Sequence, residues 1–450
     1  MKKILMILLL VLAPLCVAAE TQSDAEVRKT LIDRIDVQKQ GLGIVVGLID
    51  ENGRRIVAYG QTARGSGQAV TADTIFEIGS MTKVFTALVL SDMVQKGEVA
   101  LTDPVAKLLP SGAKIPARGG KVITLEDLAT HTSGLPRLPS NLAPKDPANP
   151  YADYTPAQLY AFLSSYELTR DIGSHYEYSN LGGGLLGHAL AIRAGTDYET
   201  LVRSRILEPL GMNSTSIRLP ETAIGQLAKG YDANLQPASN WDFSALAGAG
   251  ALRSTAKDLL TFLSAAMGLT KTPLSNAMTA MTSVRRETGS PNLEVALGWH
   301  VSKIDGREIV WHNGGTGGYR SYMGYDRQRR IGVVVLSNAS TPTGVDDIGV
   351  HLLAPSRQRQ EMKLDAALLQ RYVGSYQLAP QFVLTVTREG DRLFVQATAQ
   401  PKFEVFASGE RDFFYKVVDA QLTFELGADG RATRVILHQN GHDVPGALVR

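Results

Sequence analysis

The chain has 450 residues, with 46 lysines and arginines against 44 aspartates and glutamates, which gives a formal net charge of +2. A chain of this length can bury a large core and has room for more than one domain. The nearly balanced charge lacks the electrostatic footprint of a nucleic-acid-binding protein, so nucleic acid is not an expected partner.

The first residues carry two lysines, an apolar run over 4–17 and small residues at 18 and 19, which is the pattern of a secretory signal peptide. A membrane anchor is the alternative, but the run is shorter than the ~20 residues that a spanning helix needs. We therefore expect residues 1–19 to be removed and the protein to be periplasmic or secreted, with no stable membrane span. The only cysteine, Cys16, lies in this run, so no disulfide is expected in the mature chain.

The next residues predict a helix and a β-hairpin. A charged helix is expected over about residues 25–38, and the apolar stretch 43–50 is a predicted strand. Asn52-Gly53 is a strong hairpin signal, so residues 55–59 should return as a second strand.

The stretch Phe76–Lys83 opens the next predicted helix. Apolar residues at 81, 84, 85, 88, 89, 93 and 94 recur with spacings of three and four, and Gly97 ends the run, which indicates an amphipathic helix. Ser80 then lies in the first turn, and Lys83 lies three residues later on the same face. A hydroxyl beside an amine is the pattern of a nucleophile with its base. The positive end of the helix dipole would stabilise developing negative charge and disfavour the ammonium form of Lys83.

Ser-x-x-Lys is a weak pattern by itself. Ser111–Lys114 and Ser254–Lys257 also match it. The first match lies in a loop after Pro110, and in the second Thr255 has the pattern of a helix N-cap. Ser80 is therefore the favoured nucleophile of the three.

Six prolines between residues 136 and 156 predict a long loop after the helical stretch that contains His131. This loop is a candidate lid in which Tyr151 and Tyr154 line the rim of a pocket. A solvated insertion explains the prolines equally well.

Tyr178-Ser179-Asn180 is the second candidate site, because Tyr178 is the only one of 15 tyrosines with Asn two residues later. A phenol near a lysine ammonium ionises more easily and could take or pass a proton, and the Asn180 amide could bind a substrate carbonyl. A simple turn is the alternative. The glycines over 182–187 also match the dinucleotide pattern G-x-G-x-x-G, but no strand precedes them, which favours close helix packing.

Two predicted strands, over 296–301 and 308–312, lead into a glycine-rich stretch after His312. Residues 321–325 and 331–336 should continue the sheet in antiparallel fashion. The glycines let a substrate backbone lie close to the strand, and a free N–H there could complete an oxyanion hole. A strand-end histidine satisfied by a local hydrogen bond is the alternative for His312. The eight histidines lack metal-ligand spacing, so no metal is expected, and the absence of G-x-S-x-G excludes the α/β-hydrolase elbow.

After a polar linker over 355–363 the chain changes character. Short stretches of alternating polar and apolar residues, with turn residues between several of them, predict a small antiparallel β-barrel. The predicted strands are Tyr372–Leu378, Phe382–Thr387, Leu393–Thr398, Phe403–Ala407, Phe413–Val418, Leu422–Leu426 and Val435–Gln439.

The order Ser80-x-x-Lys83, Tyr178-x-Asn180 and His312-Asn-Gly resembles the serine β-lactamase and DD-peptidase superfamily, and most of all class C β-lactamases, DD-carboxypeptidases and β-lactamase-like esterases. The phrases that start at His131, Glu208 and Gly298 are also similar to this family. The resemblance implies an α+β fold, with an antiparallel sheet flanked by helices, a helical lobe and the site between them. The C-terminal barrel resembles a lipocalin-like domain. We expect a signal peptide over 1–19, a hydrolase domain over 20–354 and a barrel domain over 364–450.

By this resemblance Ser80 is the acylated nucleophile, Lys83 its base and Tyr178 the proton shuttle, and no cofactor is implied. Asn180 would hold the substrate amide, and the backbone N–H groups of Ser80 and Gly315 would form the oxyanion hole. The substrate-binding residues implied are Asn180, His312, Asn313, Gly314 and Gly315.

One departure from the family pattern concerns the third motif, where typical β-lactamases have Lys-Thr-Gly and this chain has His312-Asn313-Gly314. Lysine is a permanent cation that can anchor a substrate carboxylate, whereas a histidine with a pKa of about 6.5 is mostly neutral at pH 7. This difference disfavours efficient β-lactam hydrolysis. Gly315-Thr316-Gly317 is the other register in which the motif could align.

The sequence therefore predicts an exported serine hydrolase with an acyl-enzyme at Ser80, most similar to D-alanyl-D-alanine carboxypeptidases that act on D-amino-acid peptides. Hydrolysis of β-lactams or of esters by the same residues is the first alternative. A penicillin-binding sensor that is acylated without turnover is the second.

Overall fold

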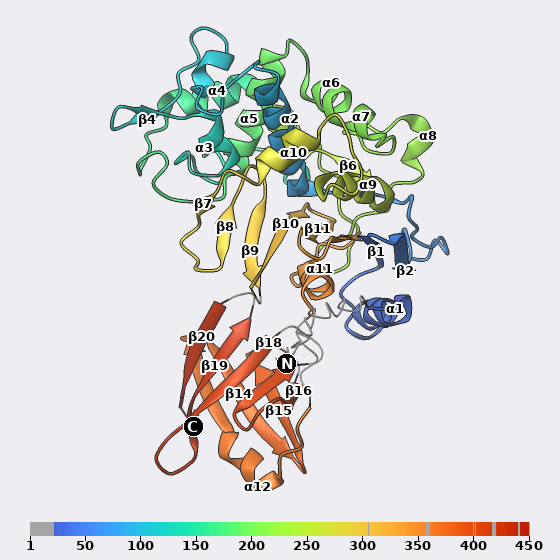
Figure 1. Ribbon diagram of the computed structural model, residues 1–450, viewed down its shortest axis with the longest axis vertical. Coiled ribbons are helices and arrows are strands. Elements are labelled where there is room, and N and C mark those ends of the chain that lie inside the picture. Colours follow the sequence, from blue (N-terminus) through green and yellow to red (C-terminus); the bar gives the residue numbers. More distant parts are fainter. Residues whose placement is uncertain are drawn as a thin grey trace, which may run out of the picture.

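The computed structural model describes residues 22–304, 306–355, 361–398, 400, 402–415, 420–439 and 442–449. Figure 1 shows a helical lobe on an antiparallel sheet, with a β-barrel at the other end of the molecule. The expected α+β architecture is confirmed. The predicted signal peptide over 1–19 lies outside the described residues. Within them, no helix combines the length and apolar character needed to cross a membrane.

Eight strands form the main sheet, in the order β2-β1-β12-β11-β10-β9-β8-β7. The N-terminal hairpin therefore pairs with a strand almost 300 positions later, in a register that runs from Ile44 opposite Ser337 to Ile49 opposite Gly332. The strands are β1 (Gly43–Asp50), β2 (Gly53–Gly60), β7 (Arg286–Glu287), β8 (Leu293–Val295), β9 (His300–Ile304), β10 (Arg307–Gly315), β11 (Arg320–Asp326) and β12 (Ile331–Ser337).

Both faces of this sheet are covered by helices, and the alternation along β1 shows how. Ile44, Val46 and Leu48 join a cluster with residues of α1 and α11, whereas Val45 and Ile49 join the larger cluster with residues of α2 and α9. These four helices are α1 (Asp24–Ile32), α11 (Asp346–Leu353), α2 (Thr82–Gln95) and α9 (Ala256–Ala266).

Helix α2 carries Lys83 and is buried on every side from Thr82 to Met93. The prediction of an amphipathic helix is wrong in this respect, because α2 lies between the sheet and the helical lobe and has no face toward solvent. One turn of 3-10 helix (Gly79–Met81) precedes it and carries Ser80. The nucleophile candidate therefore lies at the entry to the most buried helix of the fold.

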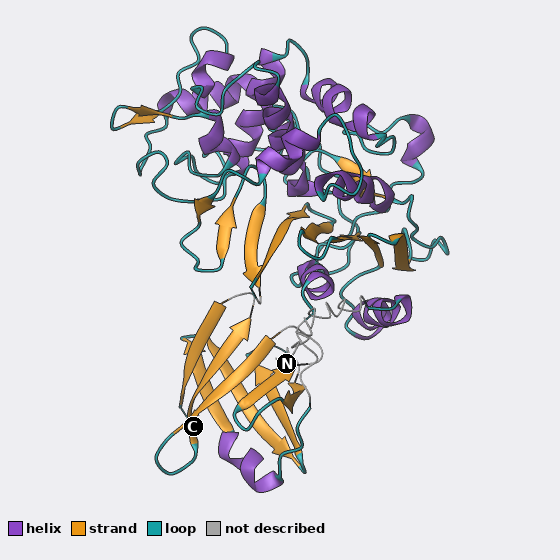
Figure 2. Cartoon of the chain, viewed as in Figure 1, coloured by secondary structure: helices purple, strands orange, loops and turns teal. Residues whose placement is uncertain are grey.

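The helical lobe gathers most of the remaining helices at one end of the molecule (Figure 2). The long proline-rich loop is confirmed between α3 and α4, although Pro156 itself is the first residue of α4, behind the N-cap Thr155. The lobe helices are α3 (Leu125–Ala129), α4 (Pro156–Ser165), α5 (Asn180–Arg193), α6 (Tyr198–Val202), α7 (Glu208–Leu210), α8 (Glu221–Ile224) and α10 (Ser275–Met281).

The glycines of α5 allow the close packing expected of them. A Cβ at Gly183 would lie 2.9 Å from Lys83 Cε, and a Cβ at Gly187 would lie 2.8 Å from the Cα of Gly248. These contacts, rather than a dinucleotide, account for the G-x-G-x-x-G pattern. Two short strand pairs complete this part of the chain, β3 (Ile75–Glu77) with β6 (Arg253–Thr255) and β4 (Ala117–Arg118) with β5 (Lys121–Val122).

The strand predicted over 296–301 begins later than expected, because β9 starts only at His300. Gly298 has a φ of +69°, which interrupts an extended backbone. A Cβ there would lie 2.7 Å from Ala87 Cβ and 2.8 Å from the Lys83 carbonyl oxygen. The chain turns here because it passes close against α2.

The C-terminal strands close into an eight-stranded antiparallel barrel with a packed interior that contains Tyr376, Phe413 and Phe424. The predicted seven strands lack the last one, β20, because Pro445 and Gly446 in it argue against a strand. Its elements are α12 (Ala366–Leu369), β13 (Gly374–Ala379), β14 (Phe382–Glu389), β15 (Arg392–Ala397), β16 (Lys402–Ala407), β17 (Asp412–Tyr415), β18 (Ala420–Leu426), β19 (Ala432–Gln439) and β20 (His442–Leu448).

Candidate active site

The amine of Lys83 is buried and has three polar neighbours. Its Nζ lies 3.1 Å from Ser80 Oγ, 2.9 Å from Asn180 Oδ1 and 2.7 Å from the Ala249 carbonyl oxygen. Burial, and after it the charge of Arg137, holds the pKa of Lys83 well below its ordinary value. A neutral amine has two N–H bonds and one lone pair. Because two of its neighbours can only accept, both N–H bonds go to them and the lone pair is left for the Ser80 hydroxyl.

Tyr178 lies beside this pair, with its ring centroid 4.9 Å from Lys83 Nζ and its hydroxyl close enough to Ser80 to be influenced by it. Burial raises the pKa of Tyr178, and the contact with Ser80 opposes this rise only in part. The prediction that a lysine ammonium makes this phenol easier to ionise is therefore wrong, since the amine itself favours the neutral form. In the resting chain Tyr178 is therefore neutral and holds the proton that a general acid would pass on.

The backbone of Tyr178–Asn180 is held by the loop that contains His131. The Ser179 N–H donates to His131 Nδ1 at 3.1 Å, and the Asn180 N–H donates to the Arg137 carbonyl oxygen at 3.0 Å. Ser179 also caps α5, because its hydroxyl accepts from the Gly182 N–H at 2.8 Å. His131 was not among the predicted site residues. Its place in the family-like phrase His-Thr-Ser-Gly-Leu was the only signal for it.

Three buried histidines surround the tyrosine. His312 on β10 is 1% exposed, its Nδ1 lies 2.6 Å from the Asn313 carbonyl oxygen, and its Nε2 has no hydrogen-bond partner among the described residues. The His300 ring lies 5.1 Å from that of His312, and the His131 ring lies 4.5 Å from that of Tyr178. Burial lowers the pKa of all three, that of His300 to about 4, so all are neutral at pH 7.

The glycines after His312 are needed for close packing within the protein. A Cβ at Gly314 would collide with the Ile78 carbonyl oxygen, and a Cβ at Gly79, where φ is +51°, would lie 2.7 Å from the Gly315 nitrogen. Close packing of the Ser80 turn on β10 thus requires these glycines, whereas the sequence interpretation assigned them to substrate. The Asn313 side chain does not line the cavity at Ser80 and donates to Asp346 on α11.

A small cavity of ≈ 20 Å³ opens at Ser80 and has room for about one water. Tyr151 lines it as predicted, but Tyr154 is buried elsewhere and donates to Asn141 Oδ1 at 2.9 Å. Trp241 and Phe243 complete an aromatic wall that sequence reasoning missed, with Tyr151 stacked on Phe243 at 4.7 Å. The lining residues are Gly79, Ser80, Tyr151, Asn180, Trp241, Phe243, Ala249, Gly250 and Gly315.

Residue Gly315 lies in this lining at the end of β10, whereas Thr316 and Gly317 do not line it. Strand β9 pairs with β10 only up to Trp311, so the segment from His312 to Gly315 extends past its neighbour toward Ser80. This arrangement favours the register in which His312-Asn313-Gly314 is the third motif.

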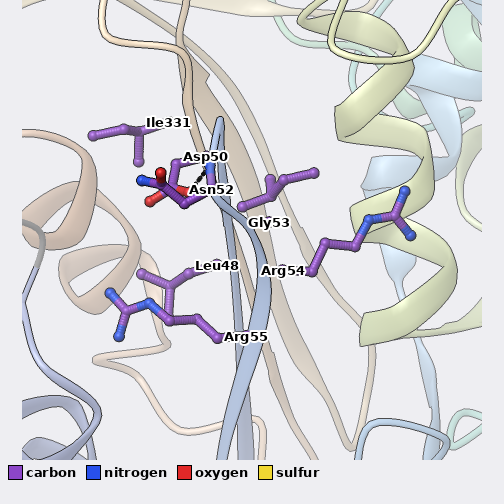
Figure 3. A pocket seen from close by; sticks show the side chains of 8 residues that line it. Leu48, Asp50, Asn52, Gly53, Arg54, Arg55 and Ile331 are labelled. Carbon is purple, nitrogen blue, oxygen red and sulfur yellow. Dashed lines mark hydrogen bonds between the residues drawn. The ribbon is translucent and has the colours of Figure 1, made fainter.

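A larger hollow, of ≈ 150 Å³, lies away from this site at the β1–β2 hairpin (Figure 3). Its two arginines are already engaged within the protein. Arg54 donates to Thr261 Oγ1 at 2.8 Å, and Arg55 donates to the Gln22 carbonyl oxygen at 2.6 Å and pairs with Asp24. We therefore place the candidate active site at Ser80.

Comparison with known proteins agrees with this geometry. Residues 28–355 match the family model described as Beta-lactamase, and residues 358–446 match a domain of unknown function, DUF3471. The chain is 30% identical over 359 residues to the D-alanyl-D-alanine-carboxypeptidase/endopeptidase AmpH of Escherichia coli strain K12, over 74% of this chain and 92% of that protein. It is 27% identical over 418 residues to a penicillin-binding protein of Bacillus subtilis strain 168, over 86% of this chain and 90% of that one.

Among solved structures, a class C beta-lactamase from Rhodobacter sphaeroides superposes with a TM-score of 0.61 at 27% identity, over 71% of this chain and 94% of its own. The family match spans well over half of the chain, and the matched residues include Ser80, Lys83, Tyr178 and Asn180. The chain therefore belongs to the beta-lactamase family and is a serine hydrolase of the β-lactamase and penicillin-binding type.

Proposed function

We propose that the protein is an exported D-alanyl-D-alanine carboxypeptidase-like enzyme, which removes the last residue of a D-amino-acid peptide through an acyl-enzyme at Ser80. In this proposal residues 1–19 direct export, 20–354 form the hydrolase domain and 364–450 form the barrel domain. The observation that carries the proposal is the contact of Ser80 Oγ with a buried amine whose other two neighbours can only accept hydrogen bonds. The relative named as a carboxypeptidase/endopeptidase supports the peptide as substrate.

Acylation begins when Ser80 Oγ attacks the substrate carbonyl carbon while its proton passes to the neutral Lys83 amine. The backbone N–H groups of Ser80 and Gly315 stabilise the oxyanion. Tyr178 then gives its phenol proton to the leaving nitrogen as the C–N bond breaks, and the Lys83 ammonium restores the proton to Tyr178. An amide and a hydroxyl have become an ester on Ser80 and a free amine.

Deacylation uses the same groups in reverse roles. Water attacks the ester carbonyl carbon and gives up a proton to the Lys83 and Tyr178 pair, and that proton returns to Ser80 Oγ as the ester C–O bond breaks. Asn180 holds Lys83 in place through its Oδ1 and leaves its amide N–H for the substrate carbonyl. The products are a shortened peptide acid and the regenerated serine.

The test is the mass of the intact mature protein after addition of benzylpenicillin, together with release of D-alanine from a peptide that ends in D-alanyl-D-alanine. We expect one penicilloyl adduct that maps to Ser80, is lost slowly, and is absent from Ser80→Ala. Ser111→Ala is the matched control, because Ser111 starts another Ser-x-x-Lys match but lies in a turn. It should keep the adduct and the release of D-alanine.

Other outcomes point to the alternatives. Rapid loss of the adduct with catalytic hydrolysis of the drug, and no release of D-alanine, would identify a β-lactamase. A persistent adduct without turnover of peptide or ester would identify a sensor. If neither adduct nor D-alanine appears, but a nitrophenyl ester is cleaved and Ser80→Ala abolishes the cleavage, the protein is an esterase and the peptidase proposal is wrong.

A further inference from the structure

The third motif places no positive charge in the site. His312 is buried, burial keeps it neutral at pH 7, and it does not line the cavity at Ser80. Lys83 also favours its neutral form. A substrate carboxylate therefore needs a cation from another part of the chain.

Arg137 is an exposed cation beside the site. Its guanidinium carbon lies 5.2 Å from the ring centroid of Tyr178. Among the described residues, no carboxylate lies within ion-pair distance of it, so its N–H groups are available to a ligand. This sets Arg137 apart from nearby Arg170, which is paired with Glu177.

The backbone of Arg137 is fixed although its side chain is exposed. The Arg137 carbonyl oxygen accepts from the N–H of Asn180 at 3.0 Å and of Leu181 at 3.2 Å, at the start of α5. The backbone that carries the Arg137 side chain is thus tied to the same short segment that presents Tyr178 and Asn180. Its charge acts on Lys83 and on Tyr178, which places it within electrostatic reach of the reacting groups.

We propose that Arg137 binds the free C-terminal carboxylate of the peptide substrate and so makes the enzyme select the last residue of a chain. This inference rests on the proposed function and assigns its specificity. The leaving nitrogen and the carboxylate carbon of the last residue are bonded to one Cα, about 2.5 Å apart. Because Tyr178 delivers a proton to that nitrogen, the carboxylate lies on the Tyr178 side of the site, where Arg137 covers the ring. A guanidinium binds a carboxylate through two parallel N–H bonds.

The test compares two peptides that differ only at the C-terminus, one ending in D-alanyl-D-alanine acid and the other in its carboxamide. For the wild type we expect kcat/KM to be higher for the acid by about 10- to 100-fold, the range of a charge-assisted hydrogen-bond pair. At a pH above the acid limb of kcat/KM of both enzymes, Arg137→Gln should remove this advantage of the acid through a higher KM and leave kcat/KM for the amide unchanged. Arg137→Lys keeps the positive charge but cannot form the two parallel N–H bonds of a guanidinium. It should therefore recover part of the preference for the acid.

Arg28→Gln is the matched control, because Arg28 is also exposed and lies over a tyrosine ring, that of Tyr59, at 5.3 Å. It should behave as the wild type. The inference is overturned if Arg137→Gln keeps the preference for the acid. It is also overturned if acid and amide lose activity equally, since Arg137 would then act through Lys83 or Tyr178 and not on the substrate.

Failure of the proposed function is visible separately. If the wild type cleaves neither peptide, the peptidase assignment is wrong, and Arg137 is then judged on acylation by benzylpenicillin against its methyl ester. A preference for the free acid that disappears in Arg137→Gln supports carboxylate binding by Arg137. Equal acylation by acid and ester, or no acylation by either, overturns it.

Discussion

Replacement of His300 by phenylalanine should make the hydrolase part of the chain more resistant to acid. The His300 ring is 7% exposed, stacks on Trp311 at 4.8 Å, and has its Nε2 3.0 Å from the Tyr176 hydroxyl. Burial, and after it the charge of Lys83, lowers the pKa of His300 from 6.5 to about 4. In the folded chain the ring therefore stays neutral over a pH range in which the unfolded chain binds a proton.

The sign and size of the effect follow from this difference. The unfolded state gains a proton as the pH falls below about 6.5, and the folded state gains it only near pH 4, so stability falls on acidification between these values. At pH 4 the pKa values of 6.5 and about 4 correspond to a loss of about 3 kcal/mol of unfolding free energy relative to pH 7. His300→Phe keeps the ring stack and removes the titration, so the fall from pH 7 to pH 4 should shrink by about 3 kcal/mol.

Urea unfolding followed by tryptophan fluorescence, at pH 7 and at pH 4, measures this quantity. The three tryptophans, Trp241, Trp299 and Trp311, all lie before the barrel, so the signal reports the hydrolase part. His175→Phe is the control, because the His175 ring is already exposed to solvent in the folded chain. If His300→Phe loses as much stability on acidification as the wild type, His300 is not held neutral by burial and the reasoning is refuted.

Three further substitutions test the packing around the site. Gly314→Ala should abolish acylation by penicillin and lower Tm, because its methyl group meets a backbone carbonyl oxygen that cannot move aside. Gly225→Ala, with open space around it, should change neither. Full acylation of Gly314→Ala would contradict this reasoning. Thr155→Ala removes the N-cap of α4 and should lower the free energy of unfolding in urea by about 1 kcal/mol. An unchanged free energy of unfolding would show that the cap does not contribute to stability. Glu77→Ala leaves the buried Arg253 with one carboxylate partner fewer and should cost about 3 kcal/mol, so a loss below about 1 kcal/mol would refute a net role for the pair.

Local patterns were enough to predict much of the fold. The hairpin of β1 and β2, the strands β11 and β12 and the break at the prolines follow from alternation and turn chemistry, which are properties of neighbouring residues. Long-range contacts decided the rest. Helix α2 looked amphipathic because its sequence does not show that the lobe covers its second face, and the turn at Gly298 exists because that segment passes close to α2.

The residues of the candidate site also divide into those that local patterns predicted and those that depend on long-range contacts. The motif residues Ser80, Lys83 and Asn180 meet as the patterns indicated, since each pattern encodes a local geometry at a helix start. The aromatic wall of Trp241 and Phe243 comes from a segment with no motif, so only the folded chain could bring it to Ser80. The pKa of Tyr178 was predicted in the wrong direction because burial, which outweighs a nearby amine here, is a property of the fold.

The charge of Arg137 links substrate binding to the basicity of Lys83. In the free enzyme this charge adds to burial in lowering the pKa of Lys83. When a substrate carboxylate neutralises Arg137, this contribution is cancelled, so the pKa of Lys83 rises and the amine becomes a stronger base in the complex.

Because the reaction needs neutral Lys83, activity falls as the pH drops through its pKa. The acid limb of kcat/KM reports the free enzyme and that of kcat reports the complex, so the limb of kcat should lie at higher pH. In Arg137→Gln the acid limb of kcat/KM should move to higher pH and coincide with the acid limb of kcat. The reason is that the guanidinium charge is then absent from both the free enzyme and the complex. Coincident limbs in the wild type would show that substrate binding leaves the Arg137 charge in place, and the link would be wrong.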